Sequence, residues 1–147
     1  MKFVISLALI AAVVSSAGRT GDASAARNQY VSCRVELNNN ALRPGSTGEL
    51  LITLVPARGI HINLNPPISF AFEGSSAVTP KGRLEIPKKD KYLDGTKAIR
   101  QSFRVPASAT PGTMVIRGTI MYYYCSDAQG WCSRFKQPVE LSVRVVK

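Results

Sequence analysis

Strict alternation of apolar and polar residues is the feature that most constrains what this chain can fold into. It runs through residues 30–37, 60–64, 68–72 and 139–145. A period of two places successive side chains on opposite faces of a β-strand. Beyond the first seventeen residues, no stretch of ten or more has the apolar spacing of a helix. The chain is therefore predicted to be all-β.

Proline and glycine separate these runs from further β-rich segments at 49–55, 84–86, 99–105 and 113–124. The polar run 88–97 is predicted to be an exposed loop. About seven to nine short strands with such turns favour an immunoglobulin-like antiparallel β-sandwich. An eight-stranded closed barrel is the alternative.

The N-terminal segment is typical of an export signal. Lys2 precedes an apolar run at 3–14, which is followed by small residues and is too short to span a bilayer. Two small-residue patterns put the cleavage site between residues 17 and 26. We expect a signal peptide at 1–25 and one β-sandwich domain at 28–147, with no transmembrane segment in the mature chain. An uncleaved anchor stays open as the alternative.

The strongly basic charge bears on the partner. The formal net charge is +10, which in a cytosolic protein would suggest nucleic acid. Export instead favours an anionic protein surface, a cell-envelope polymer or lipid headgroups, and we expect no nucleic acid. A basic surface that only maintains solubility fits equally well.

Three cysteines allow at most one intramolecular disulfide. Cys125 and Cys132 flank a turn-prone segment at 127–130, so a local bridge is easy to form. So small a ring stabilises by only about 2.5 kcal/mol, which suits a disulfide that is opened and closed by exchange; a permanent hairpin clip fits the spacing equally well. Cys33 lies on an apolar strand face and is expected to act as a small buried hydrophobe. A bridge from Cys33 to either of the other two also stays open, because immunoglobulin domains use inter-sheet links.

Three segments together carry a family resemblance: Gly-Ile-His-Ile-Asn at 59–63, Asp-Lys-Tyr-Leu-Asp-Gly at 90–95, and Cys-Ser-Asp-Ala…Gly-Trp-Cys at 125–132. The chain resembles the N-terminal periplasmic domain of the thiol:disulfide interchange protein DsbD over nearly all of residues 28–147. The resemblance implies an immunoglobulin-like sandwich with a redox-active disulfide on a hairpin. It also implies a periplasmic thiol-disulfide oxidoreductase, without cofactor or metal, that carries electrons between a thioredoxin-like protein and oxidised exported proteins.

Site residues follow from the same resemblance. Cys132 would form the mixed disulfide with the partner, and Cys125 would resolve it. Tyr92, with Leu93, falls where the family has a cap loop that shields the cysteines. The expected neighbours of the site are His61, Tyr124 and Trp131, although His61 also fits a strand histidine that faces solvent.

Two features depart from the family. The spacer between the cysteines has six residues, where the family commonly has five, so the hairpin turn is expected to differ. Residues 1–147 include neither the membrane-embedded relay nor the terminal thioredoxin-like domain of the full-length protein. Electrons are therefore expected to come from a separate protein.

Two other functions compete with thiol-disulfide exchange. One is a secreted immunoglobulin-like binding module whose disulfide is purely structural. The other is copper handling by Cys125, Cys132, Met121 and His61, which is weak because a blue-copper site needs two histidines. The sequence shows no Ser-His-Asp set, paired-carboxylate site or phosphate-binding glycine loop, so hydrolytic chemistry has no support.

Overall fold

The computed structural model describes residues 27–147. The predicted signal peptide at 1–25 and its cleavage site between 17 and 26 lie outside these residues. Within 27–147, no helix has the length and apolar character needed to cross a membrane.

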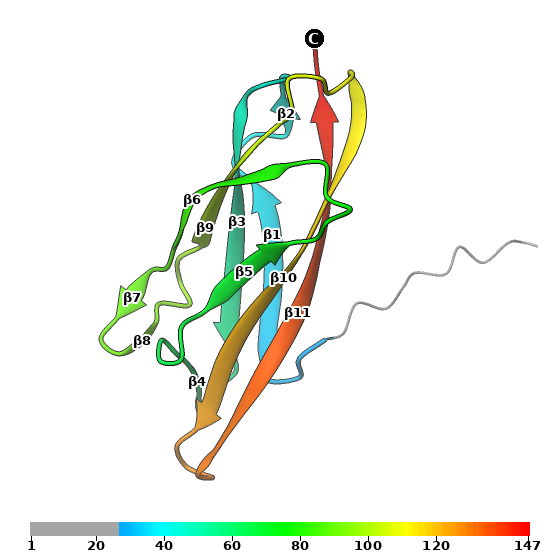
Figure 1. Ribbon diagram of the computed structural model, residues 1–147. Helices are drawn as coiled ribbons and strands as arrows, with labels where there is room; N and C mark the ends of the chain where they lie inside the picture. The colour runs from blue at the N-terminus through cyan, green and yellow to red at the C-terminus, as the bar shows by residue number, and fades with distance from the viewer. Residues whose placement is uncertain (1–26) are drawn as a thin grey trace, which may run out of the picture.

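The described residues form two β-sheets (Figure 1). The strands are β1 (Val31–Leu37), β2 (Ala41–Leu42), β3 (Thr47–Pro56), β4 (Ile60–Asn63), β5 (Ser69–Phe72), β6 (Thr79–Glu85), β7 (Lys88–Lys89), β8 (Tyr92–Leu93), β9 (Ile99–Arg104), β10 (Gly112–Ser126) and β11 (Trp131–Val145). One sheet has the order β1-β3-β9-β6, and the other has the order β2-β11-β10-β4-β8-β7 with β5 also paired to β10. The chain is thus an immunoglobulin-like antiparallel β-sandwich, as predicted, and the closed barrel is wrong.

The core lies between the two sheets. In β3 the residues Leu50, Ile52 and Leu54 are fully buried, and in β10 Ile116 and Ile120 are fully buried as well. Each such side chain contributes about 1.5–3 kcal/mol when it leaves water. Alternate residues of both strands therefore face inward, which fixes the face on which every other residue of β10 lies.

The β10–β11 hairpin is the longest feature of the fold, and its turn projects at the bottom of Figure 1. Its two strands pair without interruption from Gly112 opposite Val145 to Ser126 opposite Trp131. Only 139–145 was predicted as the last strand, whereas β11 begins at Trp131 and includes Pro138. Since β2 pairs with β11 only near its end, Pro138 lies on an open edge, where the missing N–H costs no ladder bond.

The segment 88–97 is largely exposed, as predicted, but it is not a simple loop. It forms β7 and β8, and Leu93 and Asp94 are buried. The Asp94 carboxylate accepts hydrogen bonds from the hydroxyl and the N–H of Thr96, and these bonds are the main reason why the pKa of Asp94 is lowered. These bonds order the segment locally, whereas the pairing of Tyr92 with Asn63 of β4 and the burial of Leu93 hold it against the sheet.

Candidate functional site

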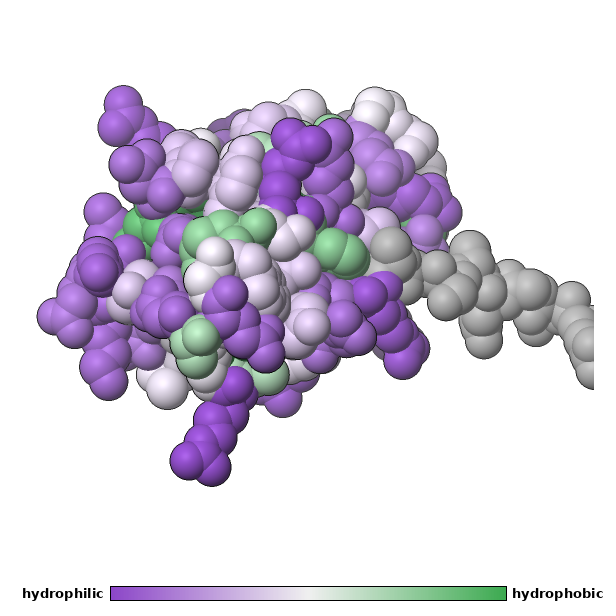
Figure 2. Space-filling model, turned by 90° about the horizontal axis from the view of Figure 1, so that it is seen from below, coloured by the Kyte–Doolittle hydropathy of each residue, from purple (hydrophilic) through white to green (hydrophobic). Residues whose placement is uncertain are grey.

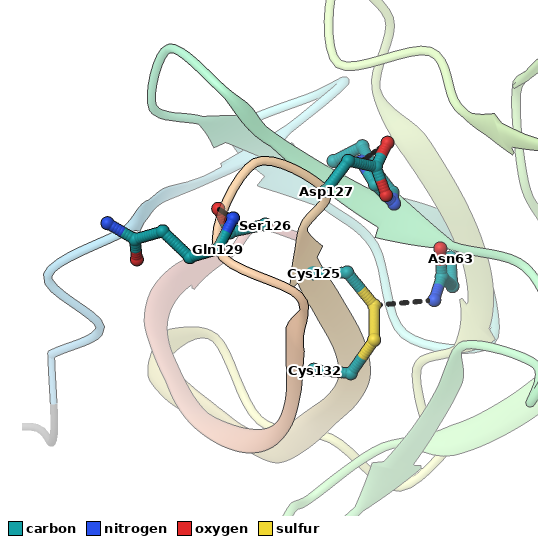
Figure 3. The surroundings of a disulfide bond; sticks show 7 residues. Asn63, Cys125, Ser126, Asp127, Gln129 and Cys132 are labelled. Carbon is teal, nitrogen blue, oxygen red and sulfur yellow. Dashed lines mark hydrogen bonds and ion pairs between the residues drawn. A yellow bond between two sulfur atoms is a disulfide. The ribbon is translucent and has the colours of Figure 1, made fainter.

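A disulfide joins Cys125 to Cys132 at the end of the hairpin (Figure 3). The two residues are directly opposite each other in β10 and β11, with Cα atoms 4.1 Å apart. The connecting turn closes through a 2.9 Å hydrogen bond from the Gly130 N–H to the Ser126 carbonyl, and Gly130 has a φ of +69° that favours glycine. The predicted local pairing and turn are confirmed.

The two cysteines differ in exposure. Because Tyr122 and Tyr124 face the core, alternation places Cys125 on the outward face of its sheet. Cys125 is nevertheless only 4% exposed, whereas Cys132 is exposed. An incoming thiolate therefore has a more open approach to Cys132.

Strand β4 places two polar side chains beside Cys125. His61 is opposite Cys125 and Asn63 is opposite Tyr123, and directly opposed residues of antiparallel strands share a face. The Asn63 side-chain Nδ2 donates a hydrogen bond to Cys125 Sγ at 2.9 Å (Figure 3). Asn63 was not predicted as a site residue, although its period-two relation to His61 places both residues on one face.

His61 is packed against its neighbours and does not face open solvent. Its side chain is 18% exposed, and its Nδ1 lies 3.5 Å from the Oδ2 of Asp127 in the hairpin turn. Its ring centroid is 4.0 Å from that of Tyr92. His61 thus links the turn, the disulfide strand and β8.

The structure separates the two residues of the expected cap loop. Tyr92 is opposite Asn63, so it lies on the same face as the disulfide and is half-buried there. Leu93 is 7% exposed and belongs to the hydrophobic core. Because neighbouring strand residues point to opposite faces, Leu93 is a core residue and cannot cover the cysteines from outside.

The expected neighbours Tyr124 and Trp131 lie on the core side of the hairpin. The Trp131 ring centroid is 5.1 Å from that of Tyr30 and 5.8 Å from that of Tyr124. The indole N–H of Trp131 also donates to the Gln129 side chain at 2.7 Å. These aromatic residues support the end of the hairpin from the face opposite the disulfide.

Positive charge lies on the same outward face as Cys132. Arg134 and Lys136 alternate with it along β11, are exposed, and form no ion pair within residues 27–147. Farther along the hairpin, Arg117 pairs with Glu140 at 2.8 Å. The end of the molecule that carries the turn is mostly hydrophilic, with small apolar areas between the polar side chains (Figure 2).

Cys33 remains a free thiol. It is half-buried rather than fully buried, and it packs against the core. Desolvation raises the pKa of the Cys33 thiol from 9.0 to about 11. Cys33 is therefore protonated at neutral pH and is a poor nucleophile.

Among residues 27–147, no group of three or more His, Cys, Asp or Glu side chains is placed to hold a metal ion.

Comparisons with known proteins identify no family for this chain. No protein-family model and no curated protein matches this chain. Among solved structures, a similar one is the GAE domain of yeast GGA1, in a crystal structure described as "yeast GGA1_GAE domain-P21". It shares 15% sequence identity with this chain at a TM-score of 0.43, and the match covers 79% of this chain and 95% of that domain.

Proposed function

We propose that this protein is a periplasmic thiol-disulfide exchange protein of the kind that its resemblance to the DsbD N-terminal domain implies. It passes reducing equivalents from a thioredoxin-like protein to oxidised exported proteins. Cys132 exchanges with each partner, and Cys125 opens and closes the intramolecular disulfide.

The single observation that carries this proposal is the unequal exposure of the two cysteines. A disulfide that serves only as a clip has no need of one open and one covered sulfur. An exchange disulfide benefits from this difference, because the rate depends on which sulfur is attacked and on access to it. Cys132 is exposed and Cys125 is 4% exposed, so attack is directed to Cys132.

The reaction consists of two balanced exchanges. A thiolate of the reduced thioredoxin-like protein attacks Cys132 Sγ, the Cys125–Cys132 bond breaks, and its electron pair leaves on Cys125 as a thiolate. The partner's second thiolate then attacks its own sulfur in the mixed disulfide and expels the Cys132 thiolate. The partner departs oxidised, and this protein holds two reduced cysteines.

The second exchange returns the disulfide. The Cys132 thiolate attacks a disulfide of an oxidised exported protein, one sulfur of which leaves as a thiolate. The Cys125 thiolate then attacks Cys132 Sγ, forms the intramolecular disulfide and releases the reduced substrate. Without Cys125, the mixed disulfide on Cys132 has no resolving thiol beside it.

Partner trapping tests the proposal. Cys125→Ser and Cys132→Ser are each made in a Cys33→Ser background, so that each variant has one thiol, and are expressed in a periplasm. Cys125→Ser should accumulate covalent complexes with a thioredoxin-like protein, which non-reducing gels and mass spectrometry identify. Cys132→Ser is the matched control and should accumulate few, because its remaining thiol is covered.

The results separate the competing functions. Equal trapping by both variants would refute the assigned roles of the two cysteines. Trapping by neither variant would favour an immunoglobulin-like binding module with a structural disulfide.

A further inference from the structure

Cys125 combines two properties that conflict in an exchange reaction. It is the sulfur on which the electron pair leaves when Cys132 is attacked, so it must carry a negative charge. It is also 4% exposed, and burial disfavours a thiolate by desolvation. A leaving thiol with a raised pKa slows exchange.

Cys33 shows in this same chain what burial does to a thiol. It is only half-buried, yet desolvation raises its pKa to about 11. Cys125 is more deeply covered but has a polar neighbour, the Asn63 side-chain amide, whose nitrogen lies 2.9 Å from its sulfur.

We propose that Asn63 is a catalytic residue that stabilises the thiolate leaving on Cys125, and thereby directs attack to Cys132. This inference rests on the proposed exchange function. A disulfide sulfur is a weak acceptor, but a thiolate is a charged one, and hydrogen bonds to charged acceptors are about twice as strong as neutral ones. The N–H···S interaction therefore strengthens as the S–S bond breaks, and it favours the transition state over the ground state.

The fold holds the Asn63 amide in place before the reaction. Asn63 lies on β4 between β10 and β8, opposite Tyr123 on one side and Tyr92 on the other. The Asn63 side chain is half-buried between these neighbours. A donor fixed in this way needs little reorganisation when charge develops.

Other charged or titratable groups also face Cys125 and must be separated from the effect of Asn63. On β4 the opposed residue is His61, which pairs with Asp127 of the turn and contacts the ring of Tyr92 on β8. On β11 the bonded residue is Cys132, with Arg134 in the next row. Substitution of Asn63 alone leaves all of these groups in place.

The test measures the titration of Cys125 as a single thiol. In the Cys33→Ser/Cys132→Ser background, the rate of alkylation by iodoacetamide is followed against pH with Asn63 or with Asn63→Leu. We expect Asn63→Leu to move the midpoint upward by about one unit, which lowers the rate near neutral pH about tenfold. Asn65→Leu, an exposed position two residues away, is the matched control and should leave the profile unchanged.

A second variant and a second measurement complete the test. Asn63→Asp has nearly the same shape and adds a like charge, so it should move the midpoint at least as far and covers the case in which Asn63→Leu does not fold. In the intact protein, both variants should slow the opening of the disulfide by dithiothreitol about tenfold and make its reduction potential more reducing.

The outcomes distinguish this inference from the proposed function. Unchanged midpoints and opening rates in both Asn63 variants would overturn the role of Asn63, even if Cys125→Ser traps partners. Shifted midpoints and slowed opening would support that role. Partner trapping uses neither iodoacetamide nor dithiothreitol, so its result bears on the proposed function alone.

Discussion

The disulfide should contribute little to the stability of the fold. The perturbation is reduction of Cys125–Cys132 in a Cys33→Ser background. The two cysteines are seven positions apart, and constraining so small a ring in the unfolded chain stabilises the folded state by about 2.5 kcal/mol. A bridge from Cys33 to the hairpin would close a ring of about a hundred residues and contribute about 4.7 kcal/mol.

The native hairpin does not depend on this bond either, because β10 and β11 pair along all fifteen residues of each strand. Urea unfolding of the oxidised and reduced forms should show a loss of no more than about 2.5 kcal/mol. The same difference corresponds to about 55 mV between the potentials of the folded and the unfolded disulfide. A loss above about 4 kcal/mol, or unfolding on reduction, would refute the reasoning and make the disulfide a structural clip.

Three further predictions concern residues away from the bond itself. Cys33, with its pKa raised from 9.0 to about 11, should react slowly with iodoacetamide near neutral pH. The buried, protonated Cys33 thiol should contribute fully to stability below pH 9 and lose that contribution as the pH rises to about 11. Urea unfolding of Cys33→Ser and of the parent chain across this pH range would measure the loss. Tyr92→Ala should speed alkylation of the reduced cysteine pair while costing about 1 kcal/mol or less, and an unchanged rate would remove Tyr92 from the site. Gly118→Ala should cost about 1–3 kcal/mol, because the added Cβ would lie 2.5 Å from the Phe70 ring; thermal unfolding checks this against Gly74→Ala, which has open space around it and should change little.

The architecture could be predicted because alternate residues of its strands face the core, and this appears in the sequence as local alternation of apolar and polar residues. Strand β1 was predicted within one residue, since its apolar side chains point to the core and its polar ones to solvent. The first half of β11 was missed for the converse reason. Around Arg134 and Pro138 the strand is an exposed edge, so neither burial nor pairing constrains its residues to a strand-like pattern.

The site was predictable only in part, because its neighbours are joined by long-range register. Spacing identified Cys125 and Cys132, which a short turn brings together. Nothing local indicates that Asn63 lies against Cys125, because the two are 62 positions apart and only the β4–β10 pairing connects them. Adjacency in the sequence was also a poor guide to the site. Trp131 precedes Cys132 in the chain but packs on the core side of the sheet.

Strand order itself accounts for the difference between the two sulfurs. Cys125 is on β10, which has β11 on one side and β4 on the other, so side chains of both neighbours flank it. Cys132 is on β11, whose other edge carries no strand at this level among the described residues. Cys125 is therefore covered and has a hydrogen-bond donor beside its sulfur, whereas Cys132 is exposed. In a hairpin exposed on both edges the two cysteines would be almost equally exposed, so the β4 segment that carries His61 and Asn63 is what makes them differ.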